Sequence, residues 1–211
     1  MRRLRLLCLH GFRSSGVSLR AQMQGSFAEL GSKLELICPD APRLADGRSA
    51  WWNAVPIAGQ SATSKRYEGW ERTRDAITSH FADSGPFDGI LGFSQGATLA
   101  GLLVGMRAPA GVATTEQLLS FGFAIFVGGF VSNDPMHAAL YEAHAGYALP
   151  SLHVIGRSDR IVPPEASRAL ATRFQAPHVV EHDGGHVIAS TAEVRRALGA
   201  FIDDQSASSL G

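Results

Sequence analysis

The sequence lacks the features that would indicate a disulfide framework, a metal centre or a membrane anchor. It has two cysteines in 211 residues, Cys8 and Cys38, and each lies in an apolar run where a buried, reduced thiol is the usual state. It contains no His-x-His or His-Glu-x-x-His motif, so we expect no metal ion and no other cofactor. No run approaches the roughly 20 apolar residues that span a bilayer. Together these absences favour a cofactor-free protein of the cytoplasm.

An excess of charge of either sign is also absent. The chain has 19 basic and 19 acidic residues, which give a formal net charge of +0 at pH 7. Without a global electrostatic field, neither nucleic acid nor an anionic membrane surface is favoured as a partner. We therefore expect a small-molecule substrate that need not be charged, and the oligomeric state stays open.

The length suits one well-buried domain and is short for two. We assign residues 1–205 to this domain and expect residues 206–211 to form a disordered tail. The apolar run that follows the first charged residues is too short for a signal peptide and lacks a small-residue cleavage site. We interpret it as the first strand.

Short apolar runs of strand length alternate with segments of helical periodicity. The strand-like runs cover residues 4–9, 34–38, 87–93, 123–127, 152–155 and 178–181, and the helical segments cover residues 16–30, 67–81, 95–106, 135–145, 164–174 and 189–202. This alternation predicts an α/β fold with a mainly parallel sheet of about six strands and helices on both faces. In such sheets the functional site lies at the carboxyl ends of the strands.

A Gly-x-Ser-x-Gly motif, formed by Gly92, Ser94 and Gly96, ends the third apolar run and leads directly into a helical pattern. A serine in a tight turn between strand and helix needs small neighbours, so that the backbone can pass close by. The free N–H groups and the positive dipole end of the helix face the same position and would stabilise an oxyanion. We therefore interpret Ser94 as a nucleophile, with a non-catalytic glycine-bounded turn as the alternative.

A serine hydroxyl needs a base to take its proton and an acid to orient that base. His186 is the favoured base, because it follows the last strand-like run in a Gly-Gly loop that can bend toward the strand ends. Asp159 follows the fifth run and is the favoured acid. Asp134, after the fourth run, is the rival acid, whereas Asp183 shares a short stretch of backbone with His186 and is less suitable. The order Ser94, Asp159, His186 is the one expected of an α/β-hydrolase.

Two backbone N–H groups are expected to complete the site as an oxyanion hole. One belongs to Gln95, which follows the nucleophile, and the other to Phe12, in the loop after the first strand. Donors of this kind each contribute about 10²–10³ in rate. His10 is interpreted as a residue that orients the Phe12 loop, rather than as an acid or a base.

The long segment of residues 41–65 has no clear period and contains paired tryptophans, which argue against disorder. Trp51, Trp52, Val162 and Val187, together with Phe12, are expected to line an apolar pocket that suits an acyl chain. The alternative for the two tryptophans is that they pack the segment onto the sheet. Whether the segment covers the site as a lid stays open.

The chain resembles the FSH family of serine hydrolases, which have the α/β-hydrolase fold. The matching stretches are residues 7–12, 48–52, 85–97, 156–159 and 184–186, and the block at 85–97 is the most specific of them. The resemblance implies a reduced sheet and carboxylesterase activity on acyl esters, with thioesterase activity in some members. It also implies that Ser94 is the nucleophile, Asp159 the acid and His186 the base.

The sequence therefore predicts a serine carboxylesterase that hydrolyses apolar acyl esters through an acyl-enzyme. Two alternatives stay open. An acyl-thioesterase would use the same residues, because a thiolate leaves from a thioester more readily than an alkoxide leaves from an ester. A binding protein without catalysis could keep the same fold, because a fold alone does not determine function.

Overall fold

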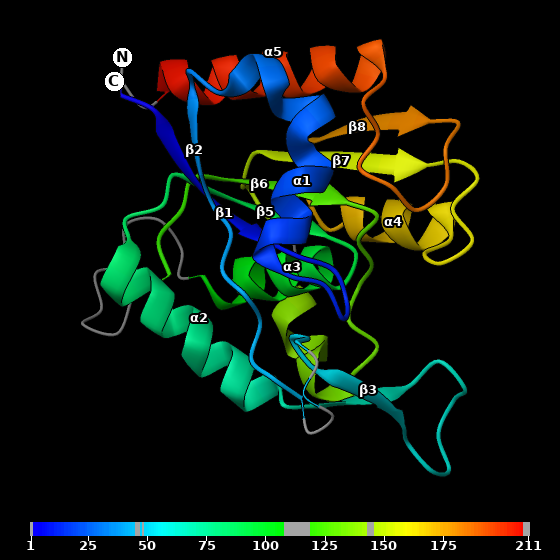
Figure 1. The fold of residues 1–211 in the computed structure, drawn as a ribbon. Helices are drawn as coiled ribbons and strands as arrows, with labels where there is room; N and C mark the ends of the chain where they lie inside the picture. Colours follow the sequence, from blue (N-terminus) through cyan, green and yellow to red (C-terminus); the bar gives the residue numbers. More distant parts are fainter. Residues whose placement is uncertain (1, 45–46, 48, 108–118, 143–145, 209–211) are drawn as a thin grey trace.

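The apolar runs of the sequence form one parallel sheet. The computed structural model describes residues 2–44, 47, 49–107, 119–142 and 146–208. The sheet has six strands in the order β2-β1-β5-β6-β7-β8, and every neighbouring pair is parallel. The strands are β1 (Leu4–Leu9), β2 (Leu34–Ile37), β5 (Gly89–Phe93), β6 (Phe123–Val127), β7 (Ser151–Gly156) and β8 (Pro177–His182) (Figure 1). The predicted parallel sheet of about six strands is confirmed.

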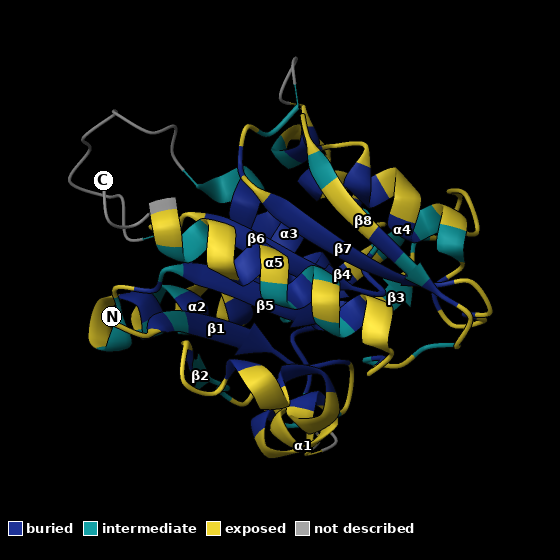
Figure 2. Ribbon diagram, turned by 90° about the horizontal axis from the view of Figure 1, so that it is seen from above, coloured by how far each residue is buried: buried dark blue, intermediate teal, exposed yellow. Residues whose placement is uncertain are grey.

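The central strands are apolar throughout because both of their faces are covered. In β1, Leu7 and Leu9 point into one hydrophobic core, whereas Leu6 and Cys8 point into the other. The alternation follows from the two-residue period of a strand. Figure 2 shows the strands buried between helices whose outward faces are exposed.

Helices cover each face of the sheet. The core that contains Leu6 is closed by α1 (Gly16–Phe27) and α5 (Ala192–Ser208). The core that contains Leu7 is closed by α2 (Trp70–Ser84), α3 (Gln95–Met106) and α4 (Pro164–Ala171). Two short 3-10 helices lie in the connections between these elements: η1 (Ala28–Leu30) between α1 and β2, and η2 (Pro135–Tyr141) between β6 and β7.

Several element boundaries differ from the sequence-based expectation. Residues 53–56 and 65–68 form a separate antiparallel hairpin, β3 (Asn53–Pro56) and β4 (Lys65–Glu68), where a loop and the start of a helix were expected. The helix expected from residue 67 begins at Trp70, because Gly69 has a φ of 95° and ends β4. At the C-terminus α5 continues to residue 208, so residues 206–208 of the expected disordered tail are helical, while residues 209–211 lie outside the described part.

The order of the strands determines where the functional loops meet. The chain moves from β1 to β2 on one side and then returns to place β5 on the other side of β1. The carboxyl ends of β1 and β5 therefore lie at a topological switch point, where parallel α/β sheets bind ligands. The loops that carry Phe12 and Ser94 both begin at this point.

Two glycines of the Gly-x-Ser-x-Gly motif are required by close backbone contacts. A Cβ at Gly96 would lie 2.0 Å from the carbonyl oxygen of Leu9, and a Cβ at Gly92 would lie 2.2 Å from the carbonyl oxygen of Gly96. Real Cβ atoms do not approach other atoms this closely, so β1, β5 and the start of α3 could not keep their present separation with larger residues. Packing alone therefore requires glycine at both positions of the motif.

Gly96→Ala should destabilise the protein by about 3 kcal/mol, the upper end for overpacking, because the new methyl group meets rigid backbone. The matched control is Gly199→Ala in α5, where a Cβ meets nothing within 4 Å. This control should stabilise the protein by about 0.5–1 kcal/mol through helix propensity. Urea denaturation of both variants measures the difference, and wild-type stability of Gly96→Ala would contradict the packing argument.

Candidate active site

Ser94 lies in the turn between β5 and α3, in a conformation that is unusual for a serine. Its φ is 57° and its ψ is −119°, a left-handed backbone that costs energy in any residue other than glycine. The Ser94 N–H donates to the carbonyl of Val127 at 2.9 Å, and its own carbonyl accepts from the N–H groups of Ala97 and Thr98. These bonds hold the strained turn, so the serine is presented at the carboxyl edge of the sheet.

Asp159 and His186 meet at the ends of two adjacent strands. Asp159 follows β7 and His186 follows β8, and Nδ1 of His186 lies 2.6 Å from Oδ2 of Asp159. The other carboxylate oxygen, Oδ1, accepts hydrogen bonds from the N–H groups of Ile161 and Val162 at 2.8 and 2.9 Å. The carboxylate is thus fixed by its own loop, with one oxygen left for the imidazole.

The His186 ring lies beside the serine turn. Its centroid lies 4.9 Å from that of the Phe93 ring, with the two planes tilted by 31°, and Phe93 is the residue before Ser94. The ring also lies close to Gly128, the residue after Val127, where a Cβ would be 3.1 Å from Cε1 of the imidazole. Among the described residues no hydrogen bond joins the Ser94 hydroxyl to His186 in this conformation, and such bonds are often long before substrate binds.

The carboxylates of the two other candidate acids, Asp134 and Asp183, bind groups other than His186. Asp134 is buried and accepts the N–H of Tyr67 at 2.7 Å and the N–H of Met136 at 3.0 Å, so it connects β4 to the start of η2. The Asp183 side chain is 94% exposed and forms an ion pair with Arg157 at 2.8 Å. The carboxylate that the structure brings to His186 is that of Asp159.

The loop after β1 is held by a neutral histidine. Nδ1 of His10 is 2.8 Å from the Gly11 carbonyl, and Nε2 accepts the Ala41 N–H at 3.0 Å, so Nδ1 carries the proton. Burial lowers the pKa of His10, which favours this uncharged form. Both ring nitrogens are therefore engaged in holding the loop that carries Phe12.

The backbone N–H groups of Phe12 and Gln95 are those that the sequence predicts for an oxyanion hole. Within the described ranges, neither N–H donates to another residue. Gln95 opens α3, where the first N–H groups of a helix have no partner within the helix. These two groups come from the two loops that begin at the switch point.

Trp51 and Trp52 are core residues. Their exposed fractions are 1% and 2%. Trp51 donates from its indole Nε1 to the His10 carbonyl at 2.8 Å, and Trp52 stacks on Tyr67 at 4.4 Å. These contacts agree with the alternative that the two tryptophans pack onto the sheet, and a contact of either residue with an acyl chain stays a prediction.

The Gln95 side chain fastens this tryptophan segment to the serine turn. Its Oε1 accepts the Trp51 N–H at 3.1 Å, and its Nε2 donates to the Trp52 carbonyl at 2.9 Å. Thr73 of α2 also donates to the Trp51 carbonyl. Buried amides paired in this way stabilise one arrangement of the surrounding backbone. The side chain of Gln95 therefore has a structural task that its position in the motif did not reveal.

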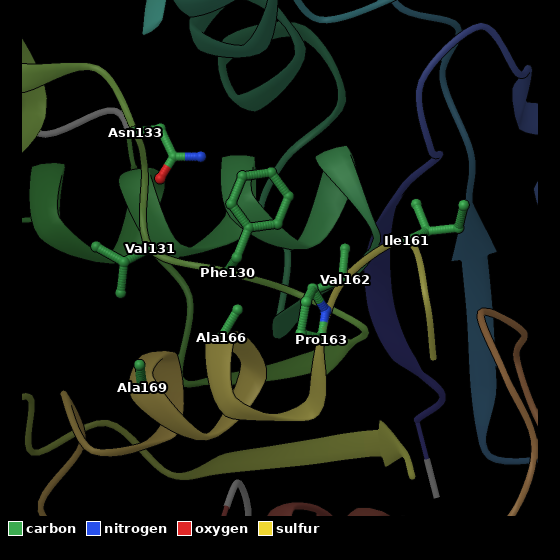
Figure 3. A pocket seen from close by; sticks show the side chains of 8 residues that line it. All are labelled: Phe130, Val131, Asn133, Ile161, Val162, Pro163, Ala166 and Ala169. Atoms are coloured by element: carbon green, nitrogen blue, oxygen red, sulfur yellow. The ribbon is translucent and has the colours of Figure 1, made fainter. Parts of the chain in front are cut away.

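A pocket of about 330 Å³ opens between the segment after β6 and the start of α4. It is lined by Phe130, Val131, Asn133, Ile161, Val162, Pro163, Ala166 and Ala169 (Figure 3). Of the expected substrate-binding residues, Val162 is part of the lining. Val187 is 52% exposed and, like Phe12, does not line this pocket.

The remaining lining residues were not identified from the sequence. Phe130 follows the Gly128-Gly129 pair at the end of β6, in a loop whose sequence has no periodic apolar pattern that would indicate a pocket wall. Ala166 and Ala169 lie one turn apart on α4, where their spacing could have indicated a shared face. The pocket adjoins the acid, because Ile161 and Val162 hold the Asp159 carboxylate.

Among the described residues, no group of three or more His, Cys, Asp or Glu side chains has an arrangement that could hold a metal ion. The helices in the described part of the chain are all too short or too polar to cross a bilayer.

Comparison with known proteins identifies relatives along nearly the whole chain. A family model described as serine hydrolase (FSH1) matches residues 1–198. Esterase OVCA2 of Xenopus tropicalis is 32% identical over 219 residues, which cover 95% of this chain and 92% of that protein. The match therefore extends over nearly the full length of both proteins.

Solved structures share the fold at lower sequence identity. Esterase PE8 superimposes with a TM-score of 0.68 and 22% identity, over 96% of this chain and 92% of the other. Acyl-protein thioesterase 2 of Zea mays gives a TM-score of 0.61 and 19% identity, over 96% and 95% of the two chains. From the family match, the esterase relatives and the α/β-hydrolase fold, we conclude that the chain belongs to the FSH1 family of serine hydrolases and is a carboxylic ester hydrolase.

Proposed function

We propose that Ser94, His186 and Asp159 are a catalytic triad that hydrolyses esters with apolar acyl groups through an acyl-enzyme. The observation that carries the proposal is the 2.6 Å contact between His186 and Asp159 beside the strained Ser94 turn. The elements that hold the three residues are separate in sequence and meet at one edge of the sheet. Such convergence of a nucleophile, a base and an orienting acid is the recognised geometry of serine hydrolases.

The reaction begins when His186 Nε2 takes the Ser94 proton as Oγ attacks the ester carbonyl carbon. Asp159 holds the other ring nitrogen, Nδ1, in its protonated form and stabilises the imidazolium that develops. The carbonyl oxygen becomes an oxyanion that accepts hydrogen bonds from the N–H groups of Phe12 and Gln95. His186 then gives its proton to the leaving alcohol, and the acyl group stays on Ser94.

Water completes the cycle by the same route. His186 takes a proton from the water as it attacks the acyl-enzyme, and returns that proton to Ser94 Oγ as the carboxylic acid leaves. Each proton transferred to His186 is passed on, so the enzyme returns to its starting state, and the hydrolysis changes no oxidation state.

The pocket beside Asp159 suits the acyl group. Its walls are mostly apolar. Phe130 lies in the segment that passes beside His186, and Val162 lies in the loop that holds the Asp159 carboxylate. Burying a methylene in such a pocket contributes about 0.8 kcal/mol. We therefore expect a higher kcat/KM for esters whose acyl chain has several carbons than for acetyl esters.

An acyl thioester is the second candidate substrate, because the same groups would act on it and the fold is shared with a protein named acyl-protein thioesterase 2. Matched oxygen and sulfur esters of one acyl chain separate the two. A kcat/KM that is higher for the oxygen ester supports the carboxylesterase, and the reverse order supports the thioesterase.

The direct test of the nucleophile is labelling with a fluorophosphonate, followed by intact mass. The wild type should gain one phosphonyl group, and Ser94→Ala should gain none, because a serine reacts only when a base activates it. Ser18→Ala, a change on the exposed side of α1, is the control and should label like the wild type. A folded wild type that stays unlabelled would contradict the proposal.

Asp159→Asn should lower kcat by about 10⁴, because an amide stabilises the wrong tautomer of His186. Asp134→Asn is the matched control, since that carboxylate is buried and hydrogen-bonded but does not contact His186. Steady-state kinetics of both variants, corrected for the folded fraction, give the comparison. Loss of turnover in Asp134→Asn with an intact rate in Asp159→Asn would move the acid role to Asp134.

Ala166→Phe should shorten the acyl chain that the enzyme accepts, because the new ring fills the pocket from α4. The expected loss of kcat/KM on long-chain esters is about tenfold, equivalent to roughly two buried methylenes, with little change on acetyl esters. Ala200→Phe on the exposed side of α5 is the control. An unchanged chain-length profile in Ala166→Phe would exclude this pocket as the acyl site.

A further inference from the structure

The turns that carry Asp159 and His186 leave the sheet side by side. Gly156, the last residue of β7, pairs with His182, the last residue of β8. From there the chain reaches Asp159 in three residues and His186 in four. The separation of the acid and the base is therefore determined by how these two short turns are joined.

Backbone contacts join the two turns directly. The Arg157 N–H donates to the His182 carbonyl at 2.8 Å, and the Ser158 N–H donates to the Gly184 carbonyl at 3.2 Å. The turns also pack without intervening side chains, since a Cβ at Gly156 would lie 2.4 Å from the Gly185 carbonyl oxygen. Any rotation of the Gly184 peptide would break the second bond and change the approach of His186 to Asp159.

One side chain fixes the orientation of Gly184. Nδ1 of His182 accepts the Gly184 N–H at 3.1 Å, while the backbone carbonyl of His182 accepts from Arg157. His182 is only 4% exposed, so water does not compete freely for this bond. The imidazole thus spans the base of the turn in the way that an Asn or Asp side chain binds the N–H two residues ahead.

The hydrogen bond requires His182 to be neutral, with its proton on Nε2. Burial lowers the pKa of His182, and the Arg157 cation acts in the same direction, whereas Asp159 and Asp183 raise it. The net shift is downward, which favours the form whose Nδ1 can accept a hydrogen bond.

We propose that His182 is a positioning residue for catalysis: by accepting the Gly184 N–H, it sets the turn that holds His186 against Asp159. The proposal rests on the proposed triad and adds a role for a second histidine that does not touch the substrate. A His186 displaced by about 1 Å loses on the order of 10²-fold in rate. The role predicts an effect on kcat, with little effect on KM, because His182 does not line the acyl pocket.

The test compares three substitutions at this position. His182→Leu removes the acceptor, and His182→Gln places its amide beyond the Nδ1 position. His182→Asn keeps an oxygen on the atom equivalent to the imidazole Cγ, so it can still accept the Gly184 N–H. The control is His153→Leu, a change at another buried histidine, which lies on β7, contacts Ser151 through Nε2 and packs on Phe126.

We expect kcat to fall about 10²-fold in His182→Leu and His182→Gln, at unchanged KM, and to recover to within a few-fold of the wild type in His182→Asn. His153→Leu should keep the kcat of the wild type for its folded fraction. If His182→Leu does not fold, the comparison of His182→Asn with His182→Gln carries the test. Equal kcat values for those two variants, or a wild-type kcat in His182→Leu, would overturn the proposal.

A spectroscopic readout separates positioning from the proposed function itself. The His186 Nδ1 proton shared with Asp159 gives a strongly deshielded NMR signal, which we expect in the wild type and in His182→Asn and expect to be weakened in His182→Gln. Persistence of the full signal in His182→Gln would contradict the positioning role. Absence of Ser94 labelling in the wild type would instead refute the proposed function, and with it the reaction that His182 is inferred to support.

Discussion

The start of α3 approaches the end of β1 so closely that no side chain fits between them. At Gly96 a single added carbon would lie 2.0 Å from the Leu9 carbonyl oxygen. This contact holds the first turn of α3 over the switch point and leaves Ser94 in a left-handed conformation. The strain is maintained because the Ser94 N–H donates to the Val127 carbonyl and the Ser94 carbonyl accepts from N–H groups of α3, which fixes both sides of the serine. The position of the hydroxyl therefore follows from backbone packing.

The remaining groups of the site reach that position through contacts between loops. His10 and Gln95 use neutral, buried hydrogen bonds to hold the Phe12 loop and the tryptophan segment against the serine turn. On the other side, the turns after β7 and β8 are joined backbone to backbone, which brings Asp159 and His186 together. Ionisable side chains take part in this assembly as well: Asp159 contacts His186, and Arg157 of the turn after β7 forms an ion pair with Asp183 of the turn after β8 at 2.8 Å.

The sequence was sufficient for the features that depend on local pattern. The six strand-like runs, the serine turn and the loops that carry Asp159 and His186 could be predicted, because buried parallel strands are apolar throughout and their ends share one edge. The β3–β4 hairpin could not, since its residues are mostly exposed and it is held by distant partners such as Asp134 and the Asn133 carbonyl. The tryptophans were ambiguous for the same reason, because their contacts are with distant partners such as the Gln95 amide, 43 and 44 residues away.

The most direct test of this account is a crystal structure of the protein after reaction with an alkyl phosphonate. The account predicts phosphorus bonded to Ser94 Oγ, with one phosphonyl oxygen within hydrogen-bond distance of the N–H groups of Phe12 and Gln95. The alkyl chain should lie between Phe130 and Val162, and His186 should keep its contact with Asp159. A phosphonyl group on another residue, or one on Ser94 whose oxygen points away from both N–H groups, would contradict it.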